Sequence, residues 1–241
     1  MADPRTYDFP RPGVAADIAI FTLPKGGECA VELHVLLIQR GAEPDISKWA
    51  LPGGFLQESD EDLDACASRE LREETGISAK YLKHFRNFSA KDRDPRWVVS
   101  AAYFALIPWE ELHPSAGSDA AAIKWFPVRA LPELAFDHSD ILREANEALK
   151  ANVDGPKGIL MLLGLVPRHF TLTELQIVHH AVCGHGTNPE DLRKRKAHFR
   201  KTILNSEKVE EVRGKFRMSS NRPAQLYKIS EIIESKIWGK Y

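Results

Sequence analysis

Residues 53–77 read GGFLQESDEDLDACASRELREETGI, and this stretch decides the fold of the first part of the chain. Its two adjacent glycines follow Pro52 and predict an irregular backbone, because glycine adopts conformations that other residues resist. Ser59, with Asp62 three residues later, predicts the capped start of a helix, and Gly76 predicts the position just past its end. The stretch therefore predicts a glycine loop that leads directly into a helix.

The acidic residues of this helix fall on the side that faces the core. At about 100° of rotation per residue, three residues form its apolar stripe: Leu63, Ala67 and Leu71. Glu70 and Glu74 lie within that stripe, and Glu73 lies at its edge. Buried carboxylates are costly unless a cation compensates them, and a divalent metal with oxygen ligands would do so. The alternative is an acidic helix surface whose carboxylates pair with Arg69 and Arg72.

This stretch resembles the Nudix box, in which a glycine, five residues, a glutamate and seven residues precede the pattern REUXEEXGU, with U aliphatic. Residues 69–77, RELREETGI, match every specified position of that pattern, and Glu61 lies at the matching distance before Arg69. The sequence departs from the box where six residues separate Gly54 from Glu61. The additional residue falls in the loop, so we expect the helix geometry to be intact.

The resemblance implies a Nudix-type α/β/α sandwich with a mixed sheet, which acts on a nucleoside diphosphate linked to another group. It implies Glu70, Glu73 and Glu74 as ligands of Mg²⁺, with Mn²⁺ as the other candidate cation. In an active hydrolase, the implied catalytic residues are Glu73, Glu74 and Arg69, which orients the carboxylates. Mg²⁺ would neutralise the charge of the diphosphate and polarise an attacking water. Which carboxylate acts as the base stays open.

A second cluster of charges, KDRDPR at residues 91–96, precedes an expected strand. Because guanidinium groups match phosphate oxygens, we expect this proline-stiffened loop to bind phosphates and ribose hydroxyls. The alternative is an ordinary charged turn. The expected ligand-binding residues are Gly53, Gly54, Arg93, Asp94 and Arg96.

Local composition predicts the other elements of the first part. Aromatic and β-branched residues predict strands, and the glycine pair 26–27 predicts that the first two strands form a hairpin-like pair. A helix is expected over residues 139–151, and the turn-rich residues 152–156 predict a domain boundary. We therefore expect an α+β ligand-binding domain over residues 1–154 and a winged helix domain over residues 155–241. The expected strands cover residues 16–23, 31–39, 81–88, 97–107 and 121–126.

The net charge of −1 conceals a division between these two parts. Residues 1–154 hold 17 Lys and Arg against 26 Asp and Glu, a net charge of −9. Residues 155–241 hold 16 Lys and Arg against 8 Asp and Glu, a net charge of +8. Such an asymmetry indicates a nucleic acid or another anionic partner for the basic part.

The basic part has the element order of a winged helix-turn-helix. An apolar helix is expected over residues 159–165, and Thr171 with Glu174 predicts the capping box of the next helix. A basic helix is expected over residues 191–205. Two short strands with the basic, polar loop RGKFRMSSNRP between them complete the motif, over residues 209–213 and 224–229.

Cations crowd this basic helix and the loop that follows it. We expect most of them to contact DNA phosphates, and one or two to reach base edges. The alternative is a solvated helix face. The expected DNA-binding residues are Arg193, Lys194, Arg195, Lys196, Arg200, Lys201, Arg217 and Arg222. Four further residues could suggest a zinc site: His179, His180, Cys183 and His185. The sequence has no second pair of ligands at the spacing of a zinc finger, so we expect these side chains to pack in the fold instead of binding zinc.

From about Val14 to Ile229 the chain resembles the NrtR-type Nudix-related transcriptional regulators, which join a Nudix domain to a C-terminal winged helix. Besides the Nudix box, the matching stretches follow in order: DRDPR, VVSAAYFAL, LPELAFDHSDIL, FTLTELQ, HFRKTIL and NRPAQLYK. The resemblance implies a homodimeric repressor that binds ADP-ribose or a related NAD-derived ligand and then releases duplex operator DNA. Some members respond to sugars, and members differ in whether they hydrolyse their ligand.

A Nudix hydrolase with a tail for dimerisation or RNA contact is the competing expectation, and a bifunctional protein would combine the two. The basic winged helix favours the regulator, since a pyrophosphatase needs no such domain. Three cysteines far apart form no disulfide framework, so a reducing compartment, the cytoplasm, is expected. No apolar run approaches the roughly 20 residues that cross a bilayer, and the start MADPRTYDFPRPG lacks an apolar signal region. We therefore expect an unprocessed protein without a membrane partner.

Overall fold

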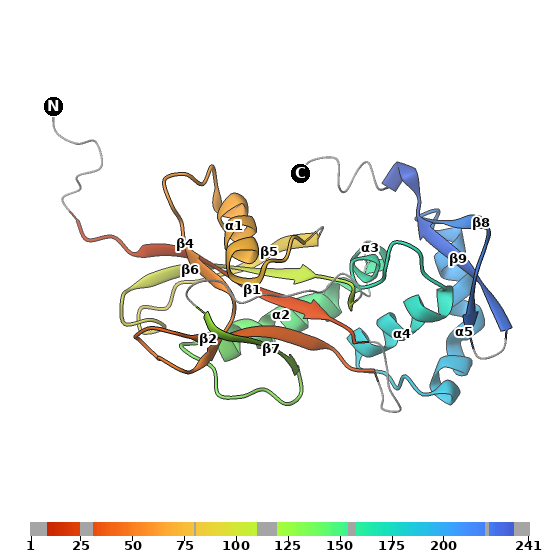
Figure 1. The fold of residues 1–241 in the computed structure, drawn as a ribbon, viewed down its shortest axis with the longest axis horizontal. Coiled ribbons are helices and arrows are strands. Elements are labelled where there is room, and N and C mark those ends of the chain that lie inside the picture. Colours follow the sequence, from red (N-terminus) through yellow and green to blue (C-terminus); the bar gives the residue numbers. More distant parts are fainter. Residues whose placement is uncertain are drawn as a thin grey trace.

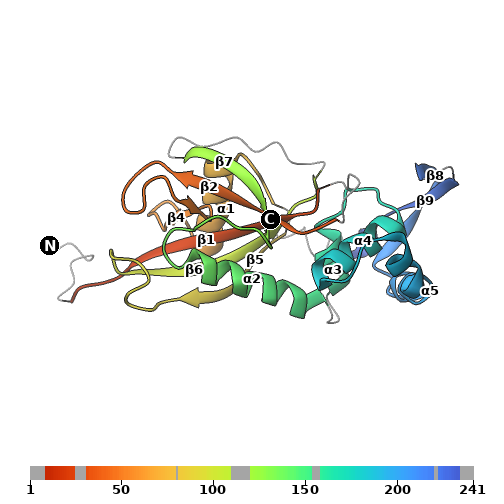
Figure 2. The same cartoon turned by 90° about the horizontal axis from the view of Figure 1, so that it is seen from below.

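A computed structural model of the chain describes residues 9–24, 31–79, 81–109, 120–153, 158–219 and 222–233. Figure 1 shows a mixed sheet with the helices α1 and α2, followed by the helices α3, α4 and α5 and a two-stranded hairpin. The view turned by 90° in Figure 2 shows α2 running along the sheet toward α3 and α4.

Within the described residues seven strands form the sheet, with the order β3-β2-β1-β6-β5, while β4 pairs with β1 and β7 pairs with β2. Strands β1 and β6 are parallel, and the other pairs are antiparallel. The sheet is therefore mixed, as expected. The strands are β1 (Gly13–Thr22), β2 (His34–Arg40), β3 (Trp49–Ala50), β4 (Gly53–Phe55), β5 (Tyr81–Phe88), β6 (Val98–Leu106) and β7 (Ala120–Pro127).

The expected pairing of the first two strands is confirmed, since Ile20 of β1 lies opposite Leu36 of β2. The glycine pair expected to connect them, residues 26–27, lies outside the described residues. Residues 49–55, which end in the glycine loop and were predicted only as irregular backbone, contain the short strands β3 and β4. These two strands attach the loop to the sheet, because β4 pairs with β1 and β3 pairs with β2.

The helix of the acidic stretch is α1 (Leu63–Thr75), and its start differs from the expected one. Ser59 is not its cap. The side chain of Asp62 accepts a hydrogen bond from the Ala65 N–H at 2.8 Å, so the helix begins after Asp62. Its end is as expected: Gly76 has φ 69° and donates its N–H to the Arg72 carbonyl oxygen at 2.9 Å.

Alternation along the strands divides the first part into three layers. Ile18 and Ile20 of β1 pack in one cluster with Ala67 and Leu71 of α1. On the opposite face Phe21 packs with the buried side of α2 (His138–Val153). The expected α/β/α sandwich and the α+β class are confirmed.

The second part consists of α3 (Gly158–Leu163), α4 (Leu172–Cys183), α5 (Pro189–Asn205), β8 (Val209–Ser219) and β9 (Arg222–Ile229). This order confirms the winged helix. Thr171 and Glu174 form the expected capping box, in which each side chain accepts from the other residue's N–H. The expectation of a polar loop after residue 213 was wrong. Strand β8 continues through a bulge at Gly214, whose φ is 70°, and pairs with β9 as far as Ser219.

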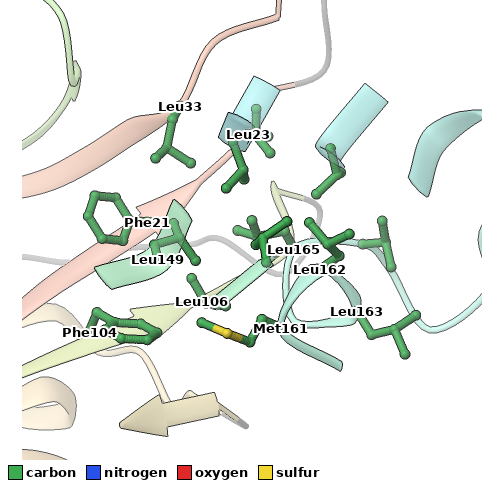
Figure 3. Close-up of a cluster of buried hydrophobic side chains, with 14 of the residues drawn as sticks. Phe21, Leu23, Leu33, Phe104, Leu106, Leu149, Met161, Leu162, Leu163 and Leu165 are labelled. Carbon is green, nitrogen blue, oxygen red and sulfur yellow. The ribbon is translucent and has the colours of Figure 1, made fainter. Parts of the chain in front are cut away.

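One hydrophobic cluster connects the two parts of the molecule. Figure 3 shows Leu106 at the end of β6 and Leu149 of α2 close to Met161 and Leu162 of α3. The helices of the winged helix therefore pack on the same core as α2. The expected boundary between residues 154 and 155 lies outside the described residues. In the described part of the chain, no helix is both long and apolar enough to cross a membrane.

Candidate functional site

The guanidinium of Arg69 lies at the centre of the acidic loop and helix. It donates to both carboxylate oxygens of Asp60 at 2.8 Å, and this bidentate pair lowers the pKa of Asp60. It also donates to Glu70 at 2.6 Å and to Glu73 at 3.1 Å. A further bond reaches the Phe55 carbonyl oxygen at 3.0 Å. Arg69 therefore connects the glycine loop to α1 by hydrogen bonds, and it orients Glu70 and Glu73, two of the expected metal ligands.

The partner of Arg69 is Asp60, whereas the sequence comparison placed Glu61 at this position of the box. Glu61 is exposed. Five residues separate Gly54 from Asp60, the spacing of the family pattern, so the apparent additional residue falls between Asp60 and α1. The spacing to Arg69 alone does not distinguish Asp60 from Glu61, because the turn before Asp62 determines which of these two neighbouring carboxylates faces the guanidinium.

Two more carboxylates contact the glycine loop. Glu70 is buried, and a Cβ atom at Gly54 would clash with its carboxylate, so glycine allows the close approach. Burial raises the pKa of Glu70, while the bond from Arg69 acts in the opposite direction. Glu74 accepts a hydrogen bond from the Gly53 N–H at 2.7 Å. The loop backbone and the acidic face of α1 are thus in direct contact.

Carboxylate oxygens are the ligands that Mg²⁺ and Mn²⁺ prefer, so Glu70, Glu73 and Glu74 fit a divalent cation by their chemistry. Glu70 in particular is a buried carboxylate whose negative charge a cation would stabilise. In the described residues no three acidic, histidine or cysteine side chains converge on one point as a formed metal site. Arg69 supplies the positive charge between Glu70 and Glu73 instead.

A cavity of about 150 Å³ lies beside Gly53 and Gly54, between β1 and the start of α2. It brings together the glycine loop, Glu74 and the charged segment before β6. Arg69, Glu70 and Glu73 lie outside its lining. Its polar lining residues are Asp17, Arg40, Glu74, Arg93, Asp94, Arg96 and His138, and its aromatic lining residues are Phe55 and Phe136.

The two arginines of the charged segment have different environments. Arg93 is buried and donates to both carboxylate oxygens of Asp137, at 2.9 and 2.7 Å, and to Asp17 at 3.5 Å. Arg96 is partly exposed, bonds to Asp94 at 2.6 and 3.0 Å, and lies over the rings of Phe55 and Phe136. From the sequence, both arginines were expected to bind the ligand. Of the two, only Arg96 has a guanidinium that a ligand can reach.

Replacing Arg93 by glutamine is expected to lower the free energy of unfolding by about 3 kcal/mol, because Asp137 and Asp17 would lose a buried cation. The matched change Arg96→Gln is expected to cost less, about 1 kcal/mol, because the Arg96 guanidinium is 41% exposed and buried Asp94 keeps its hydrogen bond from the backbone N–H of residue 96. Urea unfolding of both variants measures the difference. Equal losses would contradict the structural role of Arg93.

Sequence reasoning missed several residues of the cavity wall. His138 is buried, its Nδ1 atom accepts from the Leu51 N–H at 2.9 Å, and burial lowers its pKa. Phe136, Asp137 and His138 all come from the segment LPELAFDHSDIL, which carried part of the family resemblance and so contained the signal. Because α2 begins at His138, its first turn forms part of the cavity wall.

The cations of α5 lie on different sides of the helix. At 100° per residue, one flank of α5 carries Arg193, Lys196 and Arg200. This flank lies beside the wing, the hairpin of β8 and β9. Arg200 is close enough to Tyr227 of β9 to counteract the rise in the pKa of Tyr227 that burial causes. These three form no ion pair within the described residues. Arg195 falls on the opposite flank and lines another cavity. We name Arg193, Lys196 and Arg200 the wing-side flank.

The other expected DNA contacts have mixed environments. Arg217 bonds to Glu174 at 2.6 Å and to the His169 carbonyl oxygen at 2.9 Å, so it fastens β8 to the start of α4. Lys194 pairs with Glu190 and Asp191 within α5. Lys201 and Arg222 are exposed. Among the histidines, His180 contacts the Gly186 carbonyl oxygen at 2.9 Å, and His179 lies 3.8 Å from the Cys183 sulfur.

The fold and these residues define a class of protein: a Nudix-type sandwich with an Arg69-centred carboxylate network, joined to a winged helix with a cationic third helix. The family model of the NUDIX domain matches residues 12–145, and that of the NrtR DNA-binding winged helix domain matches residues 162–229. The chain belongs to the Nudix family, in the form that carries the NrtR winged helix.

Known proteins resemble the whole chain and its first part. The ADPR responsive transcriptional repressor NtrR of Acinetobacter baylyi is 36% identical over 237 residues, which are 95% of this chain and 87% of that protein. An ADP-ribose pyrophosphatase of Methanocaldococcus jannaschii is 39% identical over 111 residues, 46% of this chain and 64% of that enzyme. The first match extends over both domains and the second over less than half of the chain.

Solved structures show the same arrangement. Shewanella oneidensis NrtR, crystallised with a 27mer DNA, matches with a TM-score of 0.74 and 28% identity over 90% of this chain and 93% of that chain. The NUDIX domain of the same protein, crystallised with ADP ribose, matches with a TM-score of 0.53 and 32% identity over 61% of this chain and 93% of that chain. Nudix hydrolases use divalent cations in general, and the matched NUDIX domain here retains the three carboxylates.

Proposed function

We propose that this chain is a transcriptional repressor that binds ADP-ribose, or a related NAD-derived nucleotide, in its Nudix domain and releases operator DNA in response. The observation that carries the proposal is the hydrophobic cluster that connects the domain with the glycine-loop cavity to the winged helix. A basic winged helix that packs on the ligand-binding domain favours a regulator over a free hydrolase. The relatives that bind DNA and ADP-ribose support both ligands.

The cavity beside the glycine loop would hold the diphosphate of the ligand, with the rest of the ligand at its mouth. Arg96 offers a guanidinium for a phosphate, and the exposed ring of Phe55 offers an aromatic surface for a nucleobase, whereas Arg40 and Arg96 both lie over the Phe136 ring. Gly53 and Gly54 line the same cavity, so the glycine loop would lie beside the diphosphate. We propose that Mg²⁺, with Mn²⁺ as the substitute, is held by Glu70, Glu73 and Glu74. When bound, the cation would neutralise charge on the diphosphate.

Operator DNA would contact the winged helix through α5 and the wing. The wing-side flank of α5 and exposed Lys201 and Arg222 supply cations for phosphates. We propose a homodimer, because two-fold symmetric regulators place two recognition helices about 34 Å apart, or multiples of that spacing, on two half-sites. We propose that such a DNA-binding regulator works in the cytoplasm.

The two sites would communicate through α2. Its first residue, His138, lies in the cavity wall, and its last turn, with Leu149 and Val153, lies in the core shared with α3 and α4. A ligand that shifts the start of a rigid helix also shifts the elements packed on its end. The proposal therefore requires two arrangements of the winged helices, with ligand and DNA each favouring one of them.

The test is reciprocal coupling. Saturating ADP-ribose is expected to weaken operator binding by about tenfold or more, and operator DNA is expected to weaken ADP-ribose binding by the same factor. Fluorescence anisotropy measures the first change and calorimetry measures the second. Adenosine, which lacks the diphosphate, serves as the control ligand. If neither affinity changes, the repressor mechanism is wrong even if both ligands bind.

Hydrolysis of a nucleoside diphosphate is a second candidate function. It is favoured by one observation, the Asp60–Arg69 pair, which restores the loop spacing of the Nudix box. The similarity to an ADP-ribose pyrophosphatase supports it as well. Cleavage of ADP-ribose in Mg²⁺ at about 1 per second or faster would place the chain among the enzymes, alone or in addition to DNA binding.

A further inference from the structure

A second, larger cavity of about 510 Å³ lies in the winged helix part, away from the glycine loop. It opens between the end of α2, the helix α3, the last turn of α4 and one flank of α5. Its apolar floor is formed by Val153, Ile159, Leu162, Phe199 and Ile203. The proposed functions assign nothing to this cavity.

The polar rim of the cavity carries donors and cations without acidic groups. Arg195, His198 and Thr202 follow one another on the same flank of α5, at spacings of three and four residues. The remaining polar lining residues are His179, His180, His185, Ser206 and Lys208. Among the described residues that line it, none is Asp or Glu. Guanidinium, imidazole and hydroxyl groups together are a donor set for phosphate or carboxylate oxygens.

We propose that this cavity is a second small-molecule site, which binds an organic anion with an apolar or aromatic body. The phosphate or carboxylate group would lie at Arg195 and His198, and the body would lie against Ile159, the least buried apolar residue of the floor. A cavity of this volume lies within the range of small-ligand sites, whose linings are mostly apolar with a few polar groups.

DNA is the competing ligand for Arg195 and His198, and the shape of the surface around them argues against DNA. A recognition helix enters the major groove with a convex, exposed face. The side chains of the Arg195 flank are also exposed, but they border a concavity whose far wall comes from the end of α2 and from α3. The wing-side flank of α5 remains available to DNA. One helix would thus present one flank to DNA and the other to a small anion.

The test uses the full chain and phenyl phosphate as the probe. Calorimetry is expected to show saturable binding of one equivalent per chain, tighter than that of inorganic phosphate because the ring covers the apolar floor. Benzoate is expected to bind as well, and neutral benzyl alcohol is expected not to bind. Equal affinity for phenyl phosphate and inorganic phosphate would overturn the claim of a site built for an apolar body.

Three variants locate the binding. The pair Arg195→Gln with His198→Gln is expected to weaken phenyl phosphate binding at least about tenfold, since charged hydrogen bonds are lost. Thr202→Trp, at an exposed position, is expected to abolish binding by filling the cavity. The matched pair Arg193→Gln with Lys196→Gln, on the wing-side flank of the same helix, is expected to change this affinity by less than about twofold, because neither residue lines the cavity.

Two outcomes would overturn the proposal. Unchanged phenyl phosphate binding in both the Arg195/His198 pair and Thr202→Trp would place the probe elsewhere, for example at the glycine loop. A loss of operator affinity in the Arg195/His198 pair as large as that in the Arg193/Lys196 pair would assign both flanks of α5 to DNA. These results do not depend on ADP-ribose binding, so the two proposals can fail separately.

Discussion

Replacing Arg193, Lys196 and Arg200 together by glutamine is expected to weaken operator binding by about a hundredfold at physiological salt. The three side chains share the flank of α5 beside the wing and form no ion pair within the described residues. If each contacts one phosphate, each releases close to one counterion when DNA binds. The plot of log affinity against log salt should then become shallower by about 2.7 in total, measured by anisotropy between 50 and 200 mM salt.

The control for this experiment is on the same helix. Arg195→Gln removes one cation from the opposite flank, where it lines the second cavity, and is expected to leave the salt dependence unchanged. Both sets of substitutions replace side chains on a surface helix by a residue with good helix propensity, so the fold is expected to persist. An unchanged slope in the triple variant would show that the wing-side flank does not contact phosphates.

The second large effect is expected at the acidic helix. Glu73→Gln together with Glu74→Gln should lower the affinity for ADP-ribose in Mg²⁺ by about a hundredfold, because two of the three proposed metal ligands lose their charge. The amide oxygen of glutamine can still accept the hydrogen bond from Gly53, so the glycine loop is expected to keep its place. Calorimetry in Mg²⁺ and in excess chelator measures the effect. Chelator should weaken binding to the unmodified chain by a similar factor.

Glu61→Gln is the matched control, since Glu61 is an exposed carboxylate that the box spacing brought into consideration. It is expected to change the affinity by less than about twofold. If the double variant at Glu73 and Glu74 keeps its Mg²⁺-dependent affinity, these carboxylates are not the metal ligands. If Glu61→Gln weakens binding as strongly as the double variant, the assignment of Asp60 to the box position is wrong.

Local sequence signals determined most of the elements. The β-branched and aromatic residues of β1, the left-handed Gly76 after α1 and the capping box of Thr171 and Glu174 act over a few residues. Their physics is short-range, so they can be read without knowledge of the rest of the chain. The class of fold and the winged helix followed from their order. The errors at Ser59 and in β8 arose where a neighbouring acid and a bulge competed with the expected signal.

The tertiary structure decided what the charged residues do. Arg93 and Arg96 lie three positions apart, yet one is buried against Asp137 and Asp17 and the other lies over two rings. Those partners come from distant segments, so no local pattern distinguishes the two arginines. In the same way, the packing of α5 against α4 and β8 leaves Arg195 on the flank that lines a cavity and Arg193 on the flank that does not. Sequence determines which charges exist, whereas their burial and pairing depend on long-range contacts that form only when the whole core assembles.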